Sequence, residues 1–122
     1  MKINETVYEQ KLDGIFEEKD IRFAGFIDKE GGLIKGRFRD DVIPFETNEK
    51  QQEIFRELAY RVSTRKHFDY SMGPVKYSAS RREKLVMMSF PLKNCILLIT
   101  TEPNVNIDRI AYRIIQIFGK DW

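Results

Sequence analysis

Two side chains of the sequence could act as a nucleophile or a general base at neutral pH, His67 and Cys95. A cysteine–histidine pair also needs a third group that orients the base, and the sequence nominates none. His67 comes at the end of a predicted helix, where a cation suits the helix dipole. Cys95 begins a strongly apolar segment, so we expect a small buried core residue. One histidine and one cysteine also make a zinc site improbable, and the sequence therefore predicts no catalytic, cofactor or metal site.

The glycine-rich stretch FAGFIDKEGGLIKGR raises the question of a phosphate-binding loop. Such a loop joins a strand to a helix, whose first backbone N–H groups meet the phosphate. Here Gly31 and Gly32 are followed by residues that continue as a strand, and the acidic Asp28 and Glu30 would repel a phosphate. We therefore expect residues 28–32 to form the turn of a β-hairpin.

Positive charge gathers in the second half of the chain. Residues 1–60 hold ten basic and fourteen acidic side chains, whereas residues 61–122 hold eleven and five, a net charge of +6. Aromatic rings among cations suit a protein partner or single-stranded nucleic acid, and a plain solvated surface is the third interpretation. The basic stretch contains Arg61, Arg65, Lys66, Lys76, Arg81, Arg82 and Lys84, with Tyr60, Phe68, Tyr70 and Tyr77 between them.

The spacing of apolar residues predicts one α+β domain over residues 1–122. Apolar residues three and four apart predict helices, and alternating or continuous short apolar runs predict strands. Strands 21–27 and 95–101 are apolar on both faces and should be central, whereas strand 75–80 is the most polar and suits a sheet edge. The predicted elements are a helix over 4–18, strands over 21–27 and 33–38, a helix over 48–66, strands over 75–80, 85–90 and 95–101, and a helix over 107–118 capped by Asn106 and Gly119.

This order of elements resembles the roadblock/LC7 family, in the broader profilin-like group. The resemblance rests on the topology over residues 4–118 and on the pattern FAGFIDKEGGLI, an apolar strand, an acidic glycine-containing turn and a second apolar strand. It implies a five-stranded antiparallel sheet of order 2-1-5-4-3, with the middle helix on one face and the two terminal helices on the other. The chain also resembles a group of small archaeal proteins of unknown function.

The roadblock resemblance implies a function without catalysis. Members of that family commonly homodimerise by placing their middle helices together and joining the edges of their third strands. Many bind small Ras-like GTPases or serve as adaptors, so the resemblance implies a homodimeric adaptor or regulatory domain with a small GTPase or another protein as partner. The dimer or partner interface that it nominates contains Arg56, Tyr60, Arg61, Arg65, Lys76, Tyr77, Ser78, Ser80, Arg81 and Arg82.

The charge of this interface departs from the family pattern. Like charges near a twofold axis would oppose pairing unless acidic residues of the second copy neutralise them. The acidic residues close enough in sequence to do so are Glu53, Glu57 and Glu83.

Two alternative functions remain open at this point. A PAS-like ligand sensor shares the strand order but places several short helices and a pocket between its second and third strands, whereas residues 39–72 read as one long helix. The other alternative is a nucleic-acid-binding module that uses the basic stretch 61–84. No apolar run approaches the ~20 residues of a membrane helix and no secretory signal is present, so we expect a cytoplasmic protein without a membrane partner. Trp122 is expected either as a loose tail or as an anchor over the last helix.

Overall fold

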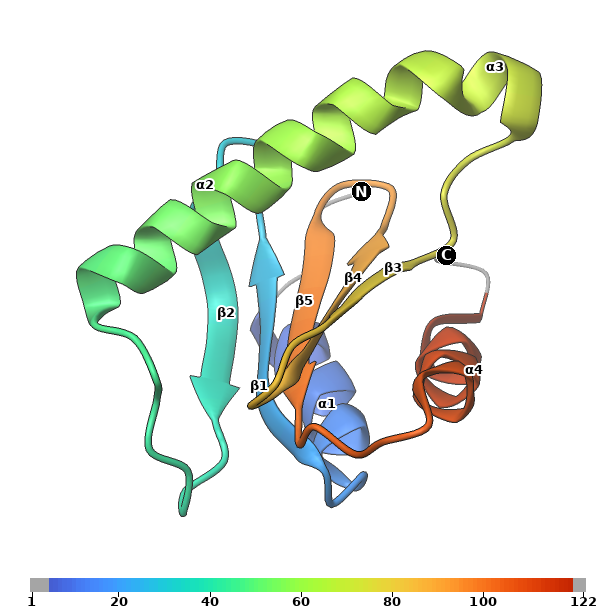
Figure 1. The fold of residues 1–122 in the computed structure, drawn as a ribbon. Helices are drawn as coiled ribbons and strands as arrows, with labels where there is room; N and C mark the ends of the chain where they lie inside the picture. The colour runs from blue at the N-terminus through green and yellow to red at the C-terminus, as the bar shows by residue number, and fades with distance from the viewer. Residues whose placement is uncertain (1–4, 120–122) are drawn as a thin grey trace.

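The computed structural model describes residues 5–119 and contains an antiparallel sheet with helices on both faces (Figure 1). The strands are β1 (Ile21–Ile27), β2 (Leu33–Phe38), β3 (Ser78–Arg81), β4 (Val86–Pro91) and β5 (Ile96–Thr101). Their order is β2-β1-β5-β4-β3, and each neighbouring pair is antiparallel. The predicted strand order and fold class are confirmed, and the two strands with apolar residues on both faces lie inside the sheet.

The helices divide between the two faces of the sheet. They are α1 (Glu5–Phe16), α2 (Asn48–Arg65), the 3-10 helix η1 (Lys66–Phe68), α3 (Asp69–Met72) and α4 (Ile107–Phe118). α2 covers one face alone, and α1 and α4 cover the other (Figure 1). This arrangement of one middle helix against two terminal helices is the one that the roadblock resemblance implies.

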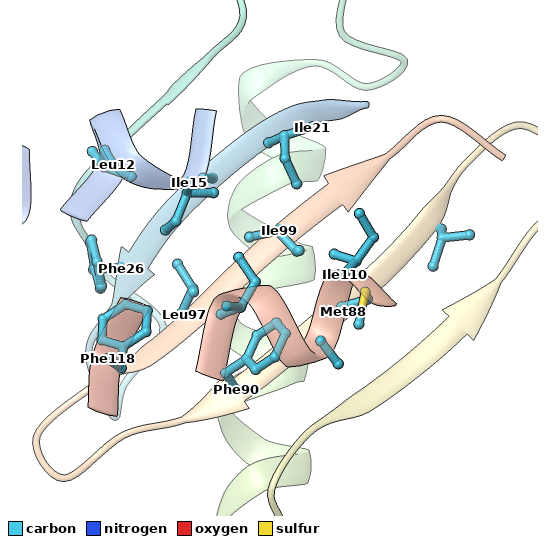
Figure 2. Packing of buried hydrophobic residues seen from close by; sticks show 14 of the residues in the cluster. Leu12, Ile15, Ile21, Phe26, Met88, Phe90, Leu97, Ile99, Ile110 and Phe118 are labelled. Atoms are coloured by element: carbon cyan, nitrogen blue, oxygen red, sulfur yellow. The ribbon is translucent and has the colours of Figure 1, made fainter. Parts of the chain in front are cut away.

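Alternation along β1 builds a core on each side of the sheet. Ala24 and Phe26 belong to the larger core with α1 and α4, whereas Phe23 and Ile27 belong to the smaller core under α2. Figure 2 shows the larger core, where Phe118 of α4 lies beside Phe26. The period of two residues along a strand therefore distributes the apolar side chains between two helical layers.

Ion pairs join α1 to the edge strand β2. Glu9 of α1 lies 3.1 Å from Lys35 and 3.2 Å from Arg37, and Asp13 lies 2.9 Å from Arg37. Glu5 adds a second carboxylate 3.2 Å from Lys35. The four-residue spacing of these acids places them on one side of α1, and the two cations of β2 point toward that helix rather than outward.

The turn between β1 and β2 packs directly against α2. One carboxylate oxygen of Asp28 accepts hydrogen bonds from the backbone N–H groups of Glu30 and Gly32, at 2.9 and 2.8 Å. Gly31 has φ +92°, and a Cβ at this position would lie 2.6 Å from the Cα of Arg56. The glycine therefore permits both the left-handed backbone of the turn and its close approach to the helix.

Two predicted elements differ from the structure. The strand predicted over 75–80 begins only at Ser78 and extends to Arg81, because its ladder with β4 starts at the pair of Ser78 and Ser89 and does not include residues 75–77. The helix predicted over 48–66 is α2, which ends at Arg65, but residues 39–72 are not one helix, because η1 and α3 follow α2. Trp122 lies outside the described residues.

Candidate interaction surface

The exposed side of α2 is one part of the candidate surface. The helix begins after Thr47, whose hydroxyl accepts a hydrogen bond from the backbone N–H of Lys50 at 3.2 Å. Its buried side chains pack on the sheet, and this places Arg56 and Tyr60 in solvent. Tyr60 is 71% exposed. A large aromatic ring is thus displayed on the side of α2 that faces away from the core.

The helical segment after α2 carries a further group of exposed apolar side chains. We call residues 66–72, which form η1 and α3, the apolar arm. Figure 1 shows that this arm projects past the sheet, and it ends at Gly73, whose φ is +82°. Phe68 and Met72 are mostly exposed and Tyr70 is fully exposed. Such a concentration of uncovered apolar groups is typical of an interaction site.

The edge strand β3 lies next to the end of α2. It pairs with β4 on one side, and the described part of the chain places no strand on its other side. Ser78 and Ser80 stand opposite Ser89 and Met87 and share their face of the sheet, the face toward α2. A guanidinium N–H of Arg65 donates to the Ser78 hydroxyl at 2.7 Å and ties α2 to this strand.

Part of the predicted interface is occupied by contacts within the chain. Tyr77 packs on Phe90, and its hydroxyl donates to Asp108 on the opposite face of the sheet at 2.7 Å. That hydrogen bond raises the pKa of Tyr77. The Arg81 guanidinium donates to the carbonyl of Val105 at 2.9 Å, and Arg61 pairs with Glu57 of its own helix at 2.6 Å.

The predicted residues therefore do not form one continuous surface. Tyr77 and Arg81 face the α4 side, whereas Arg65 and Ser78 lie at the junction of α2 and β3. The members that are exposed and take no part in these contacts are Arg56, Tyr60, Lys76, Ser80 and Arg82. The sequence interpretation did not include the arm residues Phe68, Tyr70 and Met72 in the interface. Their signal was available, because they are apolar residues that follow the last buried position of the helix.

The two residues that could act as a nucleophile or a base differ in their exposure to solvent. His67 is exposed in η1. Cys95 is 3% exposed, and burial raises the pKa of its thiol to about 11. The thiol is therefore protonated at neutral pH and packs as an apolar core group, as the sequence predicts. Among residues 5–119, no three His, Cys, Asp or Glu side chains gather where they could hold a metal ion. In the same range, no helix is long and apolar enough to cross a bilayer.

The chain matches one family in sequence and several solved structures in fold. The family is described as "Family of unknown function (DUF6659)", and its match spans residues 1–122. No protein of curated function matches the sequence.

The similar structures have the roadblock/LC7 fold. MglB from Myxococcus xanthus is 13% identical, with a TM-score of 0.73 over 94% of this chain and 91% of that one. A roadblock/LC7 domain from Streptomyces avermitilis is 8% identical, with a TM-score of 0.67 over 88% of each chain. A structure described as MglB with a tetrameric arrangement is 12% identical, with a TM-score of 0.68 over 98% and 96%. The resemblance predicted from the sequence is confirmed at the level of the fold.

Proposed function

Because the chain belongs to the DUF6659 family of unknown function and has the roadblock/LC7 fold, we propose that it is a non-enzymatic adaptor domain that works as a homodimer. The observation that carries this proposal is the open edge of β3 beside the apolar arm. An unpaired edge and uncovered apolar side chains are both features that a partner chain covers.

A second copy of the chain suits this surface because one twofold axis can serve both features. In an isologous dimer each patch meets its own counterpart, so two β3 edges can pair while the apolar arms pack together, and the exposed side of α2 with Tyr60 stays open to another protein. The hydrogen bond between Arg65 and Ser78 holds α2 and β3 in one unit. The β3 edge and the apolar arm therefore can contact the same partner at the same time.

The positive charge of the region opposes such pairing less than the sequence suggests. Arg61 is neutralised by Glu57, and Arg81 is turned toward the backbone carbonyls of Pro103 and Val105. Among the predicted interface residues, the exposed cations beside the edge that have no such partner are Lys76 and Arg82, and the exposed Lys66 of the arm adds a third charge nearby. The repulsion at a twofold axis is correspondingly reduced.

The oligomeric state tests the dimer. We expect wild-type protein at micromolar concentration to sediment with twice the 14.5 kDa mass of one chain. The double variant Tyr70→Glu, Met72→Glu places two charges in the apolar arm and should sediment as a folded monomer, since burying an unpaired charge is costly. The control Tyr112→Glu changes a tyrosine of α4 that is 65% exposed and should remain dimeric. A wild-type protein that is monomeric at these concentrations would overturn the homodimer.

We propose a small Ras-like GTPase as the partner of this adaptor. The roadblock resemblance supports this class of protein, and the exposed Tyr60 of α2 offers an aromatic anchor of the type that dominates protein interfaces. We expect wild-type protein to retain a small GTPase from native extract in the presence of a non-hydrolysable GTP analogue. Tyr60→Ala should reduce the retained amount by about tenfold or more, whereas Tyr112→Ala should not. Equal retention by the two variants, or a bound fraction without a GTPase, would contradict the proposal.

A further inference from the structure

We propose that a basic groove under the C-terminal end of α2 binds a small organic phosphate. The groove consists of two adjoining hollows of about 210 and 90 Å³ that share Val62, Lys66, Pro91 and Leu92 in their walls. It lies between α2, the segment that follows α3, and the turn that joins β4 to β5 (Figure 1). This inference does not depend on the dimer or on a GTPase partner.

Cations from four separate parts of the chain meet in this groove. Lys29 comes from the β1–β2 turn, Arg65 and Lys66 from the end of α2 and η1, Lys76 from the segment before β3, and Lys93 from the β4–β5 turn. Asp69 is the one carboxylate among the residues that line the two hollows. Five cations against one carboxylate leave an excess of four positive charges, although the whole chain has a net charge of only +2.

The charge of the groove is not neutralised within the described chain. The ion pairs of residues 5–119 involve none of its four lysines, nor Arg65, whose guanidinium donates to the neutral Ser78 hydroxyl. The cations of β2 differ, because Lys35 and Arg37 each have carboxylate partners. Like charges that gather around one hollow without a counter-charge repel one another, and an anion in the hollow relieves that repulsion.

The charge and the lining of the groove indicate which kind of anion it binds. Its excess charge favours a group with more than one negative charge, and a phosphate monoester carries two near neutral pH. Lysine ammonium groups bind phosphate as point charges, and a nearby arginine offers a planar set of donors. Val62 and Leu92 give part of the wall an apolar character, so the ligand has an apolar or aromatic portion beside its phosphate.

The size of the groove limits the ligand. Pockets for drug-sized molecules measure about 300–1,000 Å³, whereas the larger hollow here measures about 210 Å³. A phosphate with one ring or a short carbon chain fits this space. A dinucleotide does not.

The test is a titration of isotope-labelled protein with phenyl phosphate, followed by backbone amide NMR at physiological salt. We expect saturable shifts confined to residues 28–32, 59–78 and 91–96, and binding by phenyl phosphate at least several-fold tighter than by inorganic phosphate. The double variant Lys66→Gln, Lys93→Gln should weaken binding by about tenfold or more. The control Lys19→Gln, Lys84→Gln removes the same charge from exposed positions outside the groove and should leave the affinity unchanged.

Three outcomes would overturn the proposal. If the groove variant and the control variant lose the same affinity for phenyl phosphate, the ligand is attracted by the overall charge of the protein and does not bind at a defined site. Equal affinity for phenyl phosphate and inorganic phosphate would show that the groove does not recognise an apolar portion of the ligand. Binding to phosphatidylglycerol vesicles that phenyl phosphate does not compete away would assign the phosphate chemistry to a lipid headgroup instead of a soluble molecule.

Discussion

Replacing Phe26 with alanine is expected to lower the free energy of unfolding by about 4 kcal/mol, because it leaves a cavity in the larger core. Phe26 is 1% exposed, and its ring centroid lies 4.8 Å from that of Tyr8 and 6.0 Å from that of Phe118. The ring thus joins α1, β1 and α4. Urea denaturation followed by circular dichroism, at one fixed protein concentration, measures the loss as a lower midpoint.

Phe45→Ala is the matched control for this change. The same atoms are removed, but Phe45 is about half exposed and lies over Arg22 at the surface. Its loss should cost less than about 1 kcal/mol. Similar costs for the two variants would contradict the assignment of Phe26 to the centre of the core.

Replacing Gly31 with alanine should lower the free energy of unfolding by about 3 kcal/mol, from backbone strain and steric overlap together. The alanine Cβ would lie 2.6 Å from the Arg56 Cα and 2.9 Å from the Arg56 backbone nitrogen. Backbone atoms of a helix cannot move aside as the end of a flexible side chain can. The turn or α2 must therefore shift, and thermal or urea denaturation measures the cost.

Gly73→Ala separates the two contributions. Gly73 also has a positive φ, +82°, but no atom lies within 4 Å of the place of its Cβ. With ψ 161°, Gly73 adopts a backbone conformation that is essentially restricted to glycine, so this variant should lose only the backbone strain, about 2 kcal/mol. The difference between the two variants then measures how strongly the β1–β2 turn depends on its contact with α2. Equal losses would mean that this contact contributes nothing.

The fold could be predicted from the sequence because the apolar pattern of each strand agrees with the place of that strand in the sheet. β1 and β5 are apolar on both faces, and only a strand inside a sheet covered on both sides can bury such a pattern. Asn106 and Gly119 mark the two ends of α4, and each performs the capping role that its residue type favours. The start of β3 was predicted three residues too early, because alternation continues through Tyr77 although backbone pairing does not.

The surface could be predicted only in part, since it depends on contacts between distant segments. Tyr77 and Arg81 belong to the basic stretch in the sequence, but Asp108 and Val105 on the far side of the sheet bind them. No local pattern reveals those partners. The basic groove has the same origin, because Lys29 and Lys93, from two separate hairpin turns, each line a hollow whose wall is also formed by Val62 and Lys66 of the α2 end.

The two edges of the sheet differ in a way that limits the size of an assembly. β2 directs Lys35 and Arg37 toward the acids of α1, and inward-pointing charges of this kind discourage the addition of another strand. The β3 edge has two serines on its α2 face, and its one cation directed into the chain is Arg81, the last residue of the strand. In a dimer joined through β3, both outer edges of the combined sheet are β2. In the proposed dimer, growth would then end at two chains, without the open-ended fibres that a sheet with two receptive edges invites.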